Sequence, residues 1–216
     1  MNNYQQFADV GYVLLSGEIP EAVLGGLREA GELLFKEIEE DKNQGARHQT
    51  VLKPNVFHPA YIEFLNLPNL NETALEILDC DDLVFPGLAC LLGDRKHAFC
   101  KWHRDFPDSD PELIELLDHP NNCIQFNCAV YPDECLWIIP GSHRWGLLDG
   151  PRGEDSIVRM EEDVEARGTP VPVPLKPGGA LFFSNLTAHR SKLNTTQESR
   201  WSIDFRYFPT PDRANL

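Results

Sequence analysis

Two histidines and one aspartate, separated by a long stretch of chain, place the strongest constraint on the fold. His103 and Asp105 stand two residues apart, and His189 follows much later in the sequence. Side chains two apart in an extended strand point to the same side, so His103 and Asp105 can bind one ion together. His189 can join them only if the fold returns a late strand to the side of an early one. The pattern therefore favours a β-rich fold in which strands distant in sequence become neighbours.

These residue types are the ligand set of mononuclear non-haem iron sites. Two imidazoles and one carboxylate occupy one face of an octahedron around Fe(II) and leave the opposite positions open for a co-substrate and dioxygen. We therefore predict that His103, Asp105 and His189 bind iron.

Other histidines and one cysteine are weaker candidates for metal ligands. His143 follows a Pro-Gly turn and is expected to be structural. His97 would share the side of His103 on a regular strand, which makes it a reserve ligand. Cys100 lies an odd number of residues before His103, so its thiol is expected to point away and to be buried. Solvated positions in polar loops are expected for His48, His58 and His119.

Helical periodicity early in the chain gives way to short apolar runs separated by turns. A helix is expected from Pro20 to about Asp41 and another from Asn71 to Leu78, whereas residues 42–60 should form a loop or a short strand. Strands are expected at Ala98–Asp105, Cys123–Tyr131, Leu136–Ile139, Pro172–Leu175, Ala180–Ser184 and Trp201–Phe208. We predict a single domain, 1–216, in which a helical N-terminal part, 1–95, packs on a β core, 96–210. This order suits a mainly β fold with flanking helices, a double-stranded β-helix of the jelly-roll or cupin-like type.

Charge and composition exclude several classes of partner. The chain has 34 acidic against 19 basic residues and a formal net charge of −15, which repels phosphate backbones and argues against nucleic-acid binding. No apolar stretch approaches membrane-spanning length, and no signal peptide is visible at the amino terminus. The six cysteines contain no C-x-x-C pair. A cytoplasmic protein with reduced thiols, no membrane partner and an unknown oligomeric state is the default expectation.

Four motifs occur in a fixed order along the chain. They are Trp102-His103-Arg104-Asp105, Pro140-Gly141-Ser142-His143, the segment from Pro177-Gly178-Gly179 to His189-Arg190-Ser191 and Asn194, and Arg200. With them the chain resembles the phytanoyl-CoA dioxygenase-like family of Fe(II)/2-oxoglutarate oxygenases. The resemblance extends to Phe7–Leu15, which is similar to the opening strand of that family. The acidic segment after Asp105 and the turn at 132–135 depart from the family pattern, and both departures bear on substrate choice rather than on iron binding.

The resemblance implies a 2-oxoglutarate-dependent dioxygenase that uses Fe(II), 2-oxoglutarate and O2. Such an enzyme oxidises, by default hydroxylates, a C–H bond of a small-molecule substrate and releases succinate and CO2. Arg200 matches the family arginine that binds the distal carboxylate, and a guanidinium fork suits that geometry. Ser191 and Ser202 would share the inward faces of their strands and add hydroxyl donors. Arg206 is the rival to Arg200.

Gln125 and Asn127 form the polar face of an otherwise apolar strand, Cys123–Val130. They would line the pocket if that face looks into the barrel, and the alternative is a half-exposed edge strand. Two other functions stay open. One is a cupin-like metalloenzyme that does not use 2-oxoglutarate, and the other is a non-catalytic partner subunit.

Overall fold

The computed structural model describes residues 1–39, 47–50, 57–84, 88–93, 100–104, 124–145, 164–195 and 200–209. The side chains at 35–39, 47–50, 88–93, 200 and 204–209 lie outside this description. The helices are α1 (Asn3–Val10), α2 (Glu21–Glu39), α3 (Pro59–Leu65), α4 (Pro68–Leu78) and the 3-10 turn η1 (Ser142–Arg144). The strands are β1 (Tyr12–Leu15), β2 (Arg47–Thr50), β3 (Leu83–Val84), β4 (Leu88–Gly93), β5 (Cys100–His103), β6 (Ile124–Ala129), β7 (Leu136–Ile138), β8 (Val171–Pro172), β9 (Ala180–Ser184), β10 (His189–Ser191) and β11 (Arg200–Pro209).

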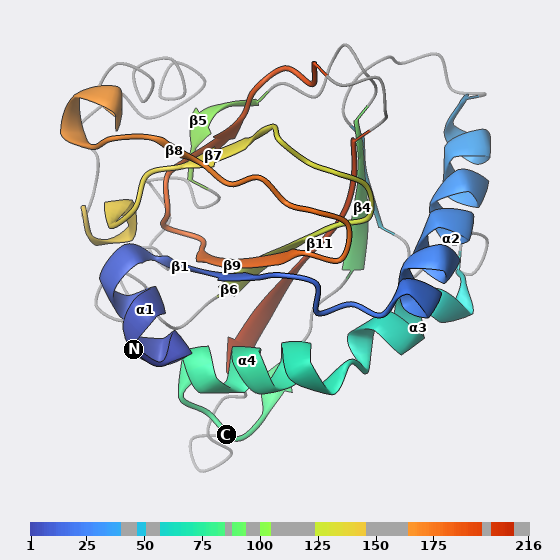
Figure 1. Ribbon diagram of the computed structural model, residues 1–216, viewed down its shortest axis with the longest axis horizontal. Coiled ribbons are helices and arrows are strands. Elements are labelled where there is room, and N and C mark those ends of the chain that lie inside the picture. The colour runs from blue at the N-terminus through green and yellow to red at the C-terminus, as the bar shows by residue number, and fades with distance from the viewer. Residues whose placement is uncertain are drawn as a thin grey trace.

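Within the described ranges, the strands form two antiparallel sheets. The larger sheet has the order β1-β9-β6-β11-β4-β2, with β3 paired to the end of β11, and the smaller sheet has the order β5-β10-β7-β8. Figure 1 shows α3 and α4 along one side of the larger sheet and the smaller sheet on the other side. Strands distant in sequence are neighbours in both sheets, such as β1 with β9 and β5 with β10, and the predicted mainly β fold with flanking helices is confirmed. Among the described helices, none is long and apolar enough to cross a bilayer.

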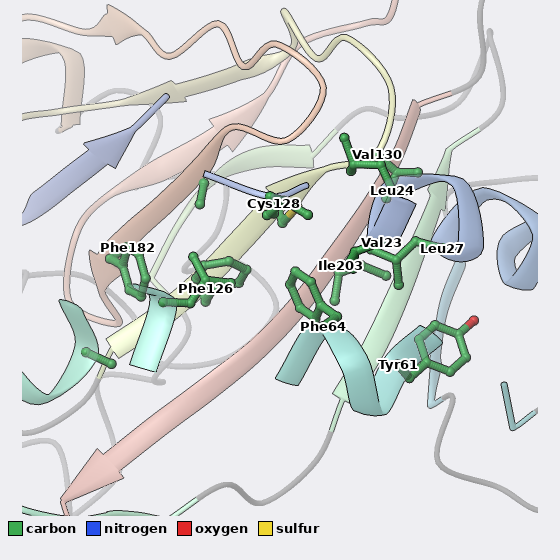
Figure 2. Close-up of a cluster of buried hydrophobic side chains, with 14 of the residues drawn as sticks. Val23, Leu24, Leu27, Tyr61, Phe64, Phe126, Cys128, Val130, Phe182 and Ile203 are labelled. Atoms are coloured by element: carbon green, nitrogen blue, oxygen red, sulfur yellow. The ribbon is translucent and has the colours of Figure 1, made fainter. Parts of the chain in front are cut away.

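The main hydrophobic core lies between the larger sheet and the helices (Figure 2). Phe126 of β6 is its centre: its ring lies 5.9 Å from that of Phe64 in α3 and 4.8 Å from that of Phe182 in β9. Leu27 of α2 and Ile203 of β11 are also buried in this cluster. Each such side chain contributes about 1.5–3 kcal/mol when it is removed from water. The helices therefore fix the outer face of the sheet whose inner face bears the candidate site.

A second cluster fills the space between the two sheets. Leu181 and Phe183 of β9 alternate with Phe182 and pack with Leu136 and Ile138 of β7 in the smaller sheet. Because successive side chains of a strand point to opposite faces, β9 is buried on both. The inner face of the larger sheet is thus identified by Leu181 and Phe183.

The N-terminal segment begins as a helix, so the expected strand over Phe7–Leu15 is only partly correct. The Asn2 side chain accepts a hydrogen bond from the Gln5 amide at 2.9 Å and caps the start of α1. Gly11, at φ 81°, ends the helix in the left-handed conformation that glycine adopts without steric cost. Only Tyr12–Leu15 continues as a strand, β1, because these two caps hold the preceding turns as helix.

The short strand expected as one possibility within residues 42–60 is present as β2. The end of that range differs from the prediction, because α3 starts there, with Pro59 at a position that suits proline and His58 as its N-cap. The predicted strand Ala180–Ser184 is confirmed as β9. A turn at residues 185–188 crosses to the smaller sheet, where β10 begins at His189. The helix expected from Pro20 to about Asp41 is present as α2 over Glu21–Glu39, and the helix expected at Asn71–Leu78 is present as α4, which begins earlier, at Pro68.

Candidate functional site

His103 and His189 lie side by side in the space between the sheets. Their strands, β5 and β10, pair antiparallel with His103 directly opposite His189. The two imidazole centroids are 4.1 Å apart, and the planes are inclined at 51°. The ring of Phe183, on the inner face of the larger sheet, contacts His189 edge-on at 4.9 Å. The fold therefore brings together two of the three predicted iron ligands.

Both imidazoles are oriented by a backbone carbonyl two residues earlier. Nδ1 of His103 lies 2.8 Å from the carbonyl oxygen of Lys101, and Nδ1 of His189 lies 2.9 Å from that of Thr187. A carbonyl oxygen only accepts hydrogen bonds, so each Nδ1 donates and each Nε2 carries the ring lone pair. Metal-bound histidines usually have this second hydrogen bond, which sets both tautomer and ring orientation. The pair therefore fits a divalent metal bound through the two Nε2 atoms.

Asp105, the third predicted ligand, lies outside the described residues, as do His97 and His119. The residue before it is described: Arg104 is buried, and its Nη2 donates to the Ser142 carbonyl oxygen at 2.8 Å. The chain is thus anchored immediately before Asp105. Over the described ranges, no three His, Cys, Asp or Glu side chains form a group suited to a metal ion.

Cys100 lies beside His103, so the expectation of a buried thiol pointing away is wrong. Its Sγ is 3.5 Å from Nδ1 of His103, and the residue is exposed. Ser191 is paired with Cys100 and His189 with His103, so β5 has one extra residue between the two pairs. Such a bulge shifts the alternation of side chains by one position. Residues at odd spacing, Cys100 and His103, can therefore share a side.

Gln125 and Asn127 are buried on the inner face of the larger sheet. They are 8% and 7% exposed, and their Cα partners on β9 are Phe183 and Leu181. Since β6 runs between β9 and β11, it is a central strand and the alternative of a half-exposed edge does not hold. Asn127 donates from Nδ2 to the Ser202 hydroxyl at 3.4 Å. The side-chain carbonyl oxygens of both amides have no hydrogen-bond partner within the described part of the chain.

The other predicted co-substrate residues flank this interior face. Ser202 is fully buried on β11, and Ser191 is half-buried on β10, two residues after His189. The backbone of Arg200 pairs with Gly93 at the start of β11. The side chains of Arg200 and of its rival Arg206 lie outside the described residues.

Ser142 connects the two histidine strands, a role that the sequence did not reveal. Its hydroxyl donates to the Ile139 carbonyl oxygen at 2.6 Å and accepts from the Ala188 amide at 2.8 Å. Its own carbonyl oxygen accepts from Arg104. Ser142 thus holds the residue after His103 and the residue before His189. The one sequence feature that pointed to Ser142 was its place in the Pro140-Gly141-Ser142-His143 motif.

Replacement of Ser142 by alanine is expected to lower both stability and iron affinity. The Ala188 amide would remain buried without its acceptor, which costs about 1–3 kcal/mol of unfolding free energy. The approach of β10 to β5 would loosen, and Fe(II) affinity should fall on the order of tenfold. Urea unfolding and anaerobic metal titration measure the two effects, with the exposed Ser16→Ala as the control. Wild-type stability in Ser142→Ala would contradict this role.

His143 holds the N-terminal helix against the same turn, as expected for a structural histidine. Its Nε2 donates to the Ala8 carbonyl oxygen at 3.0 Å, and the side chain is buried. A Cβ on Gly11 would come within 2.5 Å of Nδ1 of His143, so only glycine permits this packing. Burial lowers the pKa of His143 below its ordinary value of 6.5, and neighbouring Arg144 acts in the same direction.

This lowered pKa predicts a loss of stability in mild acid. In the unfolded chain His143 takes up a proton as the pH falls below 6.5, whereas the folded protein resists protonation until a lower pH. The unfolded state therefore binds more protons in that window. As the pH is lowered, the free energy of unfolding decreases by at most about 1.4 kcal/mol per pH unit because of this group. Urea unfolding from about pH 7.5 to about pH 5.5 measures the slope, which His143→Asn should reduce. An unchanged slope in that variant would contradict the assignment.

Comparison with known proteins identifies the family. The family model described as "Phytanoyl-CoA dioxygenase (PhyH)" matches residues 7–202. The chain is 35% identical over 84 residues to "Phytanoyl-CoA dioxygenase domain-containing protein 1" of Danio rerio, covering 36% of this chain and 28% of that protein. It is 29% identical over 97 residues to "Methylphosphonate hydroxylase" of Gimesia maris, covering 45% of this chain and 36% of that protein. The matched stretches thus span about a third of these two relatives.

Solved structures share the fold at low sequence identity. AviO1 from Streptomyces viridochromogenes Tue57 superposes with a TM-score of 0.72 at 20% identity, covering 97% of this chain and 94% of that one. EctD from S. alaskensis, solved with 2-oxoglutarate and 5-hydroxyectoine, superposes with a TM-score of 0.70 at 20% identity, covering 95% of this chain and 74% of that one. These likenesses agree with the predicted jelly-roll fold. The chain belongs to the phytanoyl-CoA dioxygenase family of 2-oxoglutarate-dependent oxygenases.

Proposed function

We propose that this chain is an Fe(II)- and 2-oxoglutarate-dependent dioxygenase that oxidises a small molecule. The observation that carries the proposal is the pairing of His103 with His189, whose rings are 4.1 Å apart and whose Nδ1 atoms both donate to carbonyl oxygens. Two imidazoles prepared in this way are the histidine half of a facial iron triad. Membership of the family supports the same conclusion.

His103, Asp105 and His189 would hold the iron in this proposal. Bound Fe(II) supplies the activation of dioxygen that oxidation of a C–H bond requires. The two histidines come from strands that are paired with each other, and both are anchored in place by hydrogen bonds of their own and adjacent residues. Asp105, two residues after His103, would supply the carboxylate. The protein contributes a fixed ligand geometry at a site between two packed sheets.

Arg200 would bind the distal carboxylate of 2-oxoglutarate. A guanidinium offers two parallel donors that match the two oxygens of a carboxylate. The buried hydroxyl of Ser202, two residues further along β11, and the hydroxyl of Ser191 would add donors. Gln125 and Asn127 would contribute amide groups to co-substrate or substrate. Their buried carbonyl oxygens without partners support this, because each such oxygen costs about 1–3 kcal/mol until a donor reaches it.

Hydroxylation of a C–H bond, with release of succinate and CO2, is the reaction that we propose for this site. EctD, one of the structural neighbours, was solved with 2-oxoglutarate and a hydroxylated small molecule, and the Gimesia maris relative is named as a hydroxylase. Both precedents concern small-molecule chemistry. We therefore propose a small-molecule substrate.

Production of succinate tests this function directly. The purified protein is incubated aerobically with Fe(II), ascorbate and 2-oxoglutarate, and succinate is quantified with and without candidate metabolites. We expect a slow iron-dependent release without substrate and a faster release with the right one. A cupin-like enzyme of another type would bind iron and form no succinate, and so would a non-catalytic subunit, so that result would reject the proposal.

A further inference from the structure

The outer face of the smaller sheet carries a polar network directly behind the two histidines. Trp102 precedes His103 on β5, and Arg190 follows His189 on β10. Trp102 is completely buried and packs with Ile139 and other residues of a third hydrophobic cluster, away from the space between the sheets. Because neighbours on a strand point to opposite faces, these two side chains lie on the reverse side of the candidate iron site.

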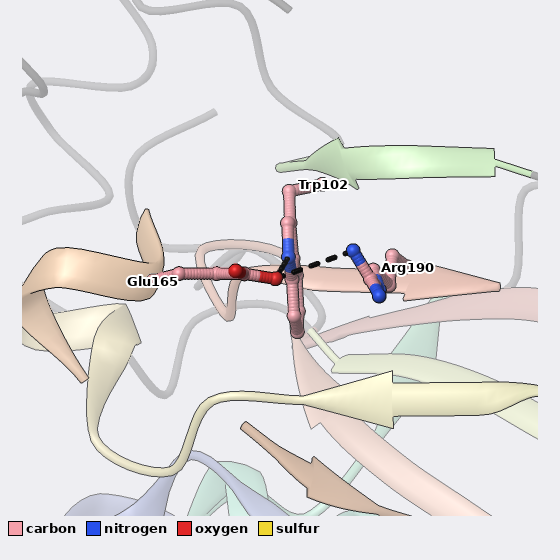
Figure 3. Close-up of polar contacts among 3 residues, drawn as sticks. All are labelled: Trp102, Glu165 and Arg190. Atoms are coloured by element: carbon pink, nitrogen blue, oxygen red, sulfur yellow. Dashed lines mark hydrogen bonds and ion pairs between the residues drawn. The ribbon is translucent and has the colours of Figure 1, made fainter. Parts of the chain in front are cut away.

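One carboxylate oxygen joins the two strands on this reverse side. Oε1 of Glu165 accepts from the indole Nε1 of Trp102 at 3.0 Å and from Nη1 of Arg190 at 3.3 Å. The Arg190 guanidinium also lies over the Trp102 ring, 5.0 Å from its centroid. Figure 3 shows Glu165 reaching toward Trp102 and Arg190 from a segment outside both strands. The three side chains therefore form one cross-strand bridge.

This bridge lies where the backbone pairing is irregular. The β5–β10 ladder aligns His103 with His189 and Cys100 with Ser191, and the register shifts between these pairs. A bulge disrupts the local hydrogen-bond ladder, so backbone pairing alone defines the strand spacing less firmly here. The side-chain bridge supplies a connection at this point that the ladder lacks.

We propose that Glu165 is a positioning residue for the candidate iron ligands His103 and His189. It acts through Trp102 and Arg190, each covalently next to one histidine, and so fixes the distance between the two imidazoles. This inference rests on the proposed function, because it concerns the same metal site. Glu165 lies on a helical turn at residues 164–167 and belongs to neither strand, so its carboxylate can be removed without changing β5 or β10.

The network is expected to influence metal binding more than global stability. The Glu165 side chain is 53% exposed, and its ion pair with Arg190 contributes about 0–1 kcal/mol. Glu165→Ala would also leave the indole N–H of the buried Trp102 without its acceptor, at a cost of about 1–3 kcal/mol, whereas Glu165→Gln keeps an acceptor there. A loosened histidine pair, in contrast, lowers metal affinity because the ion must then order its own ligands. A variant that loses metal affinity but keeps its unfolding midpoint therefore distinguishes a positioning role from a purely structural one.

Anaerobic titration with Co(II) alone, followed by its visible absorption, tests the proposal. Glu165→Ala, which removes both contacts, should raise the Co(II) dissociation constant by about three- to tenfold and change the band shape. Glu165→Gln retains an acceptor for Trp102 and should lie between that variant and the wild type. Glu134→Ala removes an exposed carboxylate outside the network and should bind as the wild type does. Metal-free Glu165→Gln, which keeps an acceptor for the buried Trp102 indole, should unfold at the wild-type midpoint to within about 2 °C.

A double-mutant cycle with Arg190→Gln completes the test. If Glu165 acts through Arg190, its removal should weaken Co(II) binding less in the Arg190→Gln background. Wild-type affinity in Glu165→Ala would overturn the proposal, and so would an equal loss in Glu134→Ala. A loss of affinity in Glu165→Gln that is accompanied by a matching drop in its metal-free unfolding midpoint would overturn it as well. Failure of the wild type itself to bind Co(II) would instead reject the proposed function, and this role with it.

Discussion

Replacement of His189 by alanine is expected to abolish iron binding and all iron-dependent succinate release. His189 is buried, faces His103 across a paired strand and presents Nε2 with Nδ1 held by the Thr187 carbonyl oxygen. Loss of an outer-shell partner costs about 10- to 100-fold in metal affinity, and loss of a ligand itself must cost more. The His189→Ala variant should remain folded, because removal of the imidazole leaves no unpaired charge in the interior.

Anaerobic Fe(II) titration and the succinate assay measure this effect together. The matched control is His58→Ala, which removes a histidine that caps α3 through Nδ1 and the Ala60 amide, away from the paired histidines. That variant should lose about 1 kcal/mol of stability and keep its iron affinity. Wild-type iron affinity in His189→Ala would show that the metal is held elsewhere.

Replacement of Arg200 by leucine is expected to remove 2-oxoglutarate binding while iron binding persists. In the proposed complex Arg200 and the distal carboxylate would form a hydrogen-bonded charge pair, and loss of one partner of such a pair costs about 2–5 kcal/mol, or about 30-fold or more in affinity. Metal affinity without 2-oxoglutarate should stay at the wild-type value, because Arg200 is not a proposed ligand. Titration of the iron-loaded protein with 2-oxoglutarate provides the dissociation constant.

Arg206→Leu is the matched control for this experiment. Arg206 lies on the same strand, six residues later, and is the rival for the same role. We expect near-normal 2-oxoglutarate binding in Arg206→Leu. The reverse result, with binding lost in Arg206→Leu and kept in Arg200→Leu, would transfer the role to Arg206. Normal binding in both would favour a metalloenzyme that does not use 2-oxoglutarate.

The elements with strong periodicity were predictable from the sequence. Helix α2 matches its predicted span because apolar residues recur at helical spacing after Pro20. Strand β9 matches at both ends because an apolar run follows a Pro-Gly turn. Strict alternation predicted that Gln125 and Asn127 share one polar face of β6, but whether that face is interior is decided by the place of β6 between β9 and β11.

Predictions from the sequence were wrong or incomplete where contacts between residues far apart in the chain determine the local structure. The thiol of Cys100 was placed on the wrong side because a bulge in β5 becomes evident only from its pairing with β10. Residues 3–10 are helical because of caps at Asn2 and Gly11, and the latter also packs tightly against His143. The connections made by Ser142 and Glu165 join segments far apart in sequence. Such contacts leave no periodic signal in one sequence.

The central claim is that the chain holds Fe(II) and 2-oxoglutarate in one site. Anaerobic addition of 2-oxoglutarate to the iron-loaded protein, monitored by visible absorption, tests it most directly. We predict a metal-to-ligand charge-transfer band that saturates at one equivalent of each and is absent in His189→Ala. A wild-type protein that binds iron and gives no such band at saturating 2-oxoglutarate would contradict the account.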